Sequence, residues 1–239
     1  MDWGLDSLET YSNLSLREIL ESSEEFFLCT QFDTQLIALA AYEGFLPMSI
    51  EFWKGPQLAL KLHHQRCILE LSQWRKSRSA RRKTQGYLLT FNKDPWSVYR
   101  GIGEQHESNW LVPELFKAFL PLFEKGRYPV QIVTVELWQE GQLQAGDLGI
   151  LSGTRYLSLT GFYRKSGSGN ILLESLAELL KKHGFELWDL GMEMDYKLKM
   201  GATLVSRVDF IKTVHQNRDV SCSLPIGEAI EVKDLLNLS

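Results

Sequence analysis

One carboxylate stands where chemistry is possible, in the stretch "FELWDLGMEMDYKLKMGA" (residues 185–202). Phe185–Trp188 is mostly apolar and predicts a buried strand that ends on Asp189, with Gly191 two residues later. A carboxylate at the end of a strand is a candidate for general acid–base catalysis. The alternative is that Asp189 only caps the strand or forms an ion pair there.

A run of basic residues is the second feature that predicts a function. The segment "WRKSRSARRK" contains no acid and the bases Arg75, Lys76, Arg78, Arg81, Arg82 and Lys83. The whole chain has a net charge of -4, so this run stands out in an acidic protein. Clustered Lys and Arg are typical of a phosphate-binding patch, and the overall acidity favours contact with one folded RNA over nonspecific duplex binding. A solvated charged face is the alternative.

The elements that position these residues follow from apolar periodicity and turn residues. Asp33 is the expected N-cap of the first helix, and Pro121 is expected to kink the second. Helices are expected over 33–44, 108–126 and 170–184. Strands are expected over 67–71, 86–91 and 185–188, and the segment 130–164 is expected to contain several more strands that form an antiparallel meander. A strand, a helix and a returning strand imply a parallel pair. The sequence therefore predicts an α+β fold with a mostly antiparallel sheet and one parallel pair.

Length and composition set limits on the organisation and on the function. The 239 residues are 44% apolar, enough for one large domain or two smaller ones. We expect a small acidic N-terminal α/β domain over 1–68 and the main domain over 69–239. The start "MDWGLDSLET" lacks the pattern of a signal peptide, no apolar run is long enough for a membrane helix, and three widely spaced cysteines favour reduced thiols in the cytoplasm. His63, His64 and Cys67 lack a second ligand pair at suitable spacing, so no metal site is expected.

Several stretches together resemble the leucyl/phenylalanyl-tRNA–protein transferase family, in its order and with nearly its spacing. They lie between about Tyr42 and Phe210 and read "AYEGFLPMS", "SQWRKSRSARR", "ESNWLVPELFKAF", "VELWQEGQLQAGDLGILSGTRY" and "LWDLGMEMDYKLKMGA". The resemblance implies a GCN5-related acyltransferase-like fold, which agrees with the expected order of elements. It also implies a reaction: an amino acid is transferred from aminoacyl-tRNA to the N-terminal amine of an acceptor protein, and this tags the acceptor in an N-degron pathway. By the same resemblance, we expect a cytoplasmic monomer that needs no cofactor.

The resemblance gives Asp189 the place of the family's catalytic aspartate. An α-amine has a pKa of about 8 and must be neutral to attack an ester, so a carboxylate beside it can accept or relay the proton. At two positions expected near Asp189, the residue type differs from that of the family. Gly191 stands where the family has a glutamine, and Leu159 stands where it has a glutamate. Either Glu193 or the substrate takes over the proton path, or the chain is a catalytically weak homologue that binds tRNA.

The resemblance also places the pocket for the donor's side chain, which is apolar and rich in methionine in the family. Two methionine positions are here Asp147 and Gly161, and the neighbouring wall positions are Leu173, Glu174 and Trp188. A buried unpaired carboxylate disfavours a leucine guest, whereas a guanidinium pairs with it in forked geometry. The hypothesis is a cationic donor, arginine above all. The alternative is that Asp147 faces water on the other side of its strand.

Two aromatic residues and one glycine-containing loop complete the candidates. By the resemblance, Tyr42 and Trp110 line the cleft near the terminal adenosine of the tRNA, where a base can stack on an aromatic ring. Ordinary core packing is the alternative for both. The segment "YRKSGSGN" places Arg164, Gly167 and Gly169 before a helix, a pattern that can cradle a pyrophosphate. It keeps an acyl-CoA-dependent N-acyltransferase as the second enzymatic reading.

Overall fold

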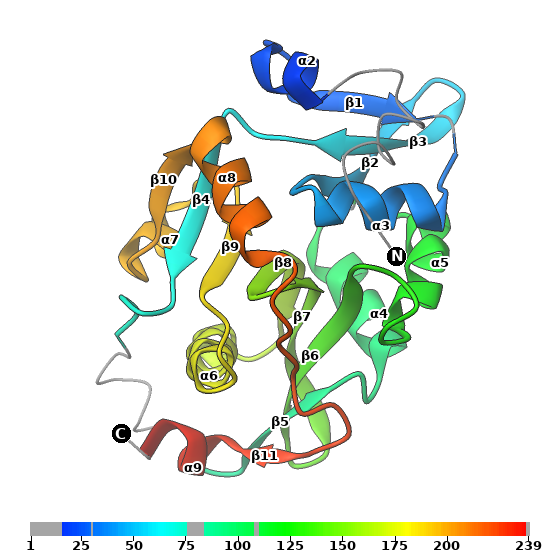
Figure 1. Cartoon of the computed structure of the whole chain (residues 1–239). Coiled ribbons are helices and arrows are strands. Elements are labelled where there is room, and N and C mark those ends of the chain that lie inside the picture. Colours follow the sequence, from blue (N-terminus) through cyan, green and yellow to red (C-terminus); the bar gives the residue numbers. More distant parts are fainter. Residues whose placement is uncertain (1–15, 30, 76–83, 108–109, 238–239) are drawn as a thin grey trace.

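Two sheets and the helices that cover them make up the molecule, shown as a computed structural model in Figure 1. The structure describes residues 16–29, 31–75, 84–107 and 110–237. Within them, the smaller sheet has the strand order β1-β3-β2 and is antiparallel throughout. Its strands are β1 (Phe26–Cys29), β2 (Leu46–Phe52) and β3 (Gly55–Lys61).

The larger sheet carries the residues of the expected site. Its strand order is β10-β4-β9-β8-β7-β6-β5-β11. The strands are β4 (Gln65–Glu70), β5 (Tyr87–Phe91), β6 (Gln131–Gln139), β7 (Gln142–Ser152), β8 (Arg155–Tyr163), β9 (Leu187–Gly191), β10 (Thr203–Ser206) and β11 (Ile230–Glu231). Of the pairs between described strands, β8 and β9 are parallel and the others are antiparallel. The α+β fold with one parallel pair is therefore confirmed.

Helices cover both faces of the larger sheet, and the sheet separates two apolar cores. Val98 of α4 and Phe116 of α5 belong to the core on one face, with the buried side of α3. Leu176 and Leu180 of α6 belong to the core on the other face, with Leu235 of α9. The helices are α2 (Leu16–Glu21), α3 (Thr34–Tyr42), α4 (Pro95–Gln105), α5 (Pro113–Phe119), the 3₁₀ helix η2 (Leu120–Phe123), α6 (Ser168–Lys182), α7 (Asp195–Lys199), α8 (Arg207–Asn217) and α9 (Val232–Asn237). We call these faces the α4 face and the α6 face.

Local sequence signals account for where α3 begins and where α5 ends. Asp33 caps α3 by accepting a hydrogen bond from the backbone N–H of Leu36 at 2.7 Å, as expected. The helix expected over 108–126 is shorter: α5 begins at Pro113, and Pro121 lies in η2. Proline lacks the backbone N–H that would continue the α-helical bonding, so the change to a 3₁₀ turn at this point follows from the residue.

The two sheets are tied together closely. In Figure 1, α3 lies between the smaller sheet and the larger one, and its buried residues share one apolar cluster with both. Arg207 of α8 donates hydrogen bonds to the carbonyl oxygens of Ile19, Ser22, Glu24 and Leu62, which fastens the N-terminal segment. Strand β4, which crosses the expected boundary at residue 68, belongs to the larger sheet. No helix in the described part of the chain combines the length and apolar character needed to cross a membrane.

Candidate active site

Asp189 lies inside a central strand and not at a strand end. The strand expected over 185–188 is displaced, because β9 begins two residues later and continues through Asp189 to Gly191. Asp189 is paired with Leu157 of β8 on one side and with Ile68 of β4 on the other. Its side chain has 0% exposure. A fully buried carboxylate needs partners for its charge.

Two arginines and one backbone amide supply these partners. Arg66 donates from Nε to Oδ1 of Asp189 at 2.7 Å and from Nη2 to Oδ2 at 3.0 Å. Arg155 donates from Nη1 to Oδ2 at 3.3 Å, and the backbone N–H of Gly191 donates to Oδ1 at 3.1 Å. A carboxylate offers about four lone-pair sites, so the described residues alone fill them all.

These contacts set the protonation state of the cluster. Burial by itself would raise the pKa of Asp189, but the charge and hydrogen bonds of Arg66, followed by Arg155 and the Gly191 amide, bring it below its usual value. Burial lowers the pKa of Arg155 to about 10, so its guanidinium stays charged at neutral pH. The cluster thus holds two buried positive charges against one negative charge. Sequence reasoning missed both arginines, because neither lies near Asp189 in the chain.

His63 extends the cluster beyond Arg66. Its Nδ1 accepts a hydrogen bond from Nη1 of Arg66 at 2.6 Å, because a guanidinium can only donate. Burial, followed by the charge of Arg66, lowers the pKa of His63 to about 3, so the ring is neutral and carries its proton on Nε2. Residues 16–29, 31–75, 84–107 and 110–237 hold no group of His, Cys, Asp and Glu side chains suited to a metal ion.

Asp147 lies on the opposite face of the same sheet. It belongs to β7 and is 5% exposed, so the alternative that it faces water is wrong. Tyr156 and Ser158 of β8 donate their hydroxyl hydrogens to its Oδ2, at 2.5 and 2.9 Å. Ser158 in turn accepts a hydrogen bond from Nε1 of Trp188 at 3.0 Å. Tyr156 and Trp188 belong to the α6-face core, which places Asp147 on that face.

The partners of Asp147 are hydroxyl groups and not cations. Burial raises its pKa to about 7, although the hydrogen bonds from Tyr156 and Ser158 and the more distant charge of Lys197 act in the other direction. Its second oxygen, Oδ1, accepts no hydrogen bond from the residues that the structure describes. A Cβ at Gly161 would lie 3.1 Å from this oxygen. Gly161 therefore lies so close to this oxygen that even one added methyl group would crowd it.

The remaining pocket candidates divide between the two faces. Gly161 is the cross-strand partner of Asp147, and Leu173 packs on the α6-face core. Glu174 is half-buried on α6. Leu159, by contrast, packs against the α4-face core. The structure thus brings Asp147, Gly161, Leu173 and Trp188 onto one face and leaves Leu159 on the other face with Asp189.

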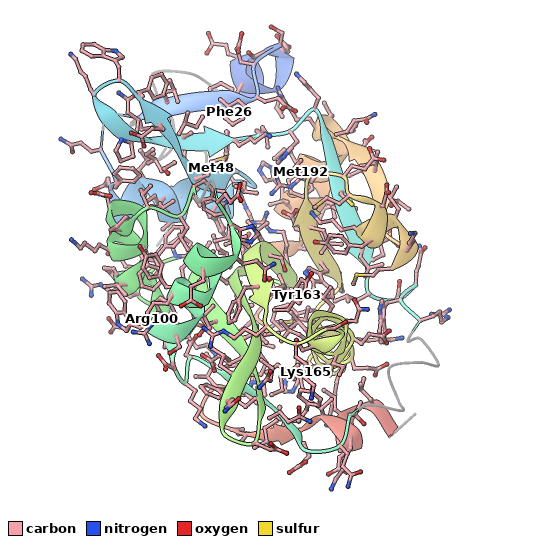
Figure 2. The ribbon with its side chains drawn as sticks, turned by 180° about the vertical axis from the view of Figure 1, so that it is seen from behind. Phe26, Met48, Arg100, Tyr163, Lys165 and Met192 are labelled. Carbon is pink, nitrogen blue, oxygen red and sulfur yellow. The ribbon has the colours of Figure 1, made fainter. Side chains whose placement is uncertain are left out.

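The pairing of β8 with β9 stops before either strand ends. Their pairing ends at Leu157↔Asp189, and the residues of β8 that follow, Ser158 to Gly161, are partly exposed. Figure 2 shows Tyr163 at the end of β8 near α6 and Met192 just beyond β9, and both are more than half exposed. The part of β8 that follows Leu157 is therefore not paired with β9.

The aromatic candidates have other partners. The Tyr42 hydroxyl donates a hydrogen bond to Asp219, and the guanidinium of Arg218 lies over its ring at 4.3 Å. Burial, followed by the Asp219 hydrogen bond, raises the pKa of Tyr42 to about 12. The described contacts thus cover one face of this ring. Trp110 is half-buried, and its carbonyl oxygen accepts a hydrogen bond from the hydroxyl of Ser49.

The basic run is described only at its first residue. Arg75 is exposed, and its Nη1 donates to the carbonyl oxygens of Ser72 and Trp74. It follows the end of β4 where Glu70 pairs with the start of β9, while Gly191 lies at the opposite end of β9. Five members of the expected patch lie outside the described residues: Lys76, Arg78, Arg81, Arg82 and Lys83.

The loop before α6 is held by contacts within the chain. Arg164 forms an ion pair with Glu104 at 2.8 Å. Gly167 is the N-cap residue, with a φ of 87° and no side-chain cap. The Ser168 hydroxyl donates to the carbonyl oxygens of Gln144 and Lys165. Arg164, the first residue of this pattern, thus forms its ion pair at an exposed site.

Known proteins are similar to most of this chain. A leucyl/phenylalanyl-tRNA–protein transferase of Desulfatibacillum aliphaticivorans is 30% identical over 130 residues, which cover 54% of this chain and 54% of that protein. One of Ruegeria pomeroyi is 27% identical over 161 residues, which cover 66% of this chain and 71% of that protein. The chain thus spans about half the length of the first of these relatives. The C-terminal domain of a putative lysylphosphatidylglycerol synthetase from Agrobacterium fabrum has a TM-score of 0.44 and 14% identity, covering 75% of this chain and 68% of that one.

A protein-family model also matches this chain. The model described as leucyl/phenylalanyl-tRNA protein transferase matches residues 68–215, more than half of the chain. This span includes Asp147, Arg155 and Asp189, whereas Arg66 and His63 lie just before it. The chain belongs to the leucyl/phenylalanyl-tRNA protein transferase family.

Proposed function

We propose that this protein transfers an aminoacyl group from charged tRNA to the N-terminal α-amine of an acceptor protein. The family match over residues 68–215 is the observation that carries the proposal. The amine nitrogen attacks the ester carbonyl, the bond from that carbon to the ribose oxygen breaks, and the amine's proton ends on the ribose hydroxyl. Ester to amide is downhill, so holding the two reactants together can supply about 7 to 11 kcal/mol of the barrier.

Asp189 serves this reaction mainly by holding its arginines. All four of its lone-pair sites are filled, so accepting a proton requires one hydrogen bond to open, and the longest is the 3.3 Å contact from Arg155. A lowered pKa also makes Asp189 a weak base. The net positive charge of Arg66 and Arg155 favours the oxyanion that develops during attack.

We propose that the donor is cationic, with arginine the best fit. The support comes from Asp147, a buried carboxyl group whose Oδ2 is held by two hydroxyls and whose Oδ1 accepts no hydrogen bond from the described residues. A leucine or phenylalanine side chain would remove water from Oδ1 without giving it a hydrogen bond, which is costly. A guanidinium would donate to it and favour its ionised form.

The tRNA contacts are also proposals. We assign the acceptor arm to the basic run that starts at Arg75, and the terminal adenosine to the half-buried Trp110. Tyr42 is better explained as a packing residue of α3, because Arg218 and Asp219 already contact it. We extend the proposal to a cytoplasmic monomer whose product is an N-degron. Turnover of a reporter carrying the acceptor N-terminus, with and without the protein, tests this extension.

A panel of charged tRNAs tests the function and the donor together. Purified protein receives Arg-, Lys-, Leu- and Phe-tRNA with peptides that differ in their first residue, and peptide-bound label is measured. We expect Arg-tRNA to be favoured by about 10- to 100-fold, the worth of one charge-assisted hydrogen bond. Asp147→Met, which removes the carboxylate, should shift the preference toward Leu-tRNA.

The other outcomes separate the competing readings. A preference for Leu- or Phe-tRNA in the unchanged protein removes the cationic donor but keeps the transfer reaction. Binding of charged tRNA without transfer to any peptide supports a binding homologue. Acetylation of the peptides from acetyl-CoA supports the acyl-CoA reading.

A further inference from the structure

Lys197 is a buried lysine beside the candidate active site that has no part in the reaction described above. It belongs to α7 and is 7% exposed. Its Nζ donates to the carbonyl oxygen of Leu190 at 2.6 Å and to that of Met192 at 2.8 Å. These residues flank Gly191, so one ammonium group holds both sides of the turn at which β9 ends.

One peptide unit connects this lysine to Asp189. The carbonyl of Leu190 and the N–H of Gly191 belong to the same planar group, and they point in opposite directions. The carbonyl accepts from Lys197, and the N–H donates to Oδ1 of Asp189 at 3.1 Å. A force that fixes the carbonyl therefore fixes the direction of the N–H.

The turn needs such a fixing contact. Gly191 has a φ of 74°, in the left-handed region where glycine has many conformations open to it. The ammonium also lies within electrostatic reach of Asp189, Arg66, Asp147 and Cys67. Burial lowers the pKa of Lys197, and the carbonyl contacts compensate part of the lost hydration.

We propose that Lys197 is a positioning residue of the transfer reaction: its ammonium locks the Leu190–Gly191 peptide so that the Gly191 N–H holds Asp189 in place between Arg66 and Arg155. This inference rests on the proposed function. It explains why a charged side chain is buried at this turn, where an apolar residue would fill the same space but would take a hydrogen-bond donor away from two carbonyl oxygens.

Lys197→Met and Lys199→Met form the matched test pair. Both lysines lie on α7, but Lys199 is exposed. In protein labelled with ¹⁵N-glycine, hydrogen exchange at the Gly191 amide is measured by NMR. Single-turnover transfer at saturating charged tRNA and the Kd for that tRNA are measured on the same samples.

We expect Lys197→Met to speed exchange at Gly191 at least about tenfold and to slow single-turnover transfer by up to about 100-fold, with no change in the Kd. Lys199→Met should leave all three unchanged, and Lys197→Arg, which keeps the charge and the donors, should restore much of the rate. If Lys197 had a purely structural role, Lys197→Met would lower the stability but would not slow transfer while leaving the Kd for charged tRNA unchanged. Should Lys197→Met fail to fold, Lys197→Gln is measured in the same way, because it loses the charge but keeps an N–H donor.

Unchanged exchange at Gly191 in a folded Lys197 variant would overturn the inference, as would faster exchange with an unchanged transfer rate. Failure of the proposed function looks different. In that case the unchanged protein transfers nothing from any charged tRNA, whereas failure of this inference alone leaves an active protein and an equally active Lys197 variant.

Discussion

Two buried carboxyl groups on one sheet, Asp189 and Asp147, have opposite surroundings. Asp189 faces the α4 side, where two guanidinium groups and a backbone amide fill its lone-pair sites. Asp147 faces the α6 side, where two hydroxyl groups share a single oxygen. The pKa of Asp189 falls below its usual value, and burial raises that of Asp147 to about 7.

The difference shows that burial does not by itself decide what a carboxyl group can do. Cationic partners make Asp189 a permanent anion that orders its neighbours. Neutral partners leave Asp147 able to gain or lose a proton near neutral pH, and able to accept a charged guest. This difference is our reason for proposing donor selection by Asp147 and an organising role for Asp189.

Asp189→Asn should have the largest effect, because it removes the only negative charge that contacts Arg66 and Arg155 in the described cluster. Leaving buried charges unpaired costs about 3 to 5 kcal/mol of unfolding free energy. Urea unfolding at pH 7 measures this loss, and Asp195→Asn, at an exposed position of α7, is the control. A loss no larger than that of the control would mean that the ion pairs do not stabilise the fold.

The same comparison predicts opposite responses to pH. Asp189 has a lowered pKa in the folded protein, so its stabilisation is present above the unfolded pKa and is lost as the pH falls through the folded value. Asp147 has a pKa raised from 3.8 to about 7, so the folded protein keeps a proton that the unfolded chain has released between these values. Its contribution to stability therefore falls as the pH rises from about 4 to 7, and then levels off.

Asp147→Asn tests this second response and should have the next largest effect. The amide cannot ionise, so the variant should lose the decline in stability between about pH 4 and 7, which amounts to at most about 4 kcal/mol for a single group. Unfolding free energies measured at pH 4 and pH 8 give the difference directly. A variant that declines as steeply as the unchanged protein would show that another group titrates in this range.

The sequence predicts the local parts of this arrangement but not the pairing. The N-cap at Asp33, the meander from β6 to β8 and the parallel return through α6 follow from residue patterns, and all are present. Arg66 is 123 residues from Asp189, and nothing in a basic residue of a strand indicates its partner. The short helix α7 and the buried Lys197 were missed for the same reason, since their contacts depend on how β9 ends.

Gly161→Ala should affect only the Asp147 side of the comparison. The added Cβ would lie 2.7 Å from the carbonyl oxygen of Gly146 and 3.1 Å from Oδ1 of Asp147. We expect a loss of about 1 to 3 kcal/mol from overpacking and a reduced preference for a cationic donor. Gly169→Ala on α6 is the control, because its Cβ would meet only ordinary contacts with Tyr163 at 3.5 Å. Equal effects of the two variants on donor preference would argue against Oδ1 as the contact.

Gly191→Ala should have the smallest effect on stability and is the finest test of the Asp189 side. Gly191 and Gly141 both have a φ of 74°, and neither would place a Cβ closer than 3.5 Å to another residue. Because L-residues at this φ cost about 1 to 2 kcal/mol, both alanine variants should lose that amount in urea unfolding. Only Gly191 donates to Asp189 and lies beneath Lys197, so only Gly191→Ala should also slow transfer at saturating tRNA. If the two variants lost stability equally and both kept the full transfer rate, the direction of the Gly191 amide would have no part in catalysis, and Asp189 would be held by its arginines alone.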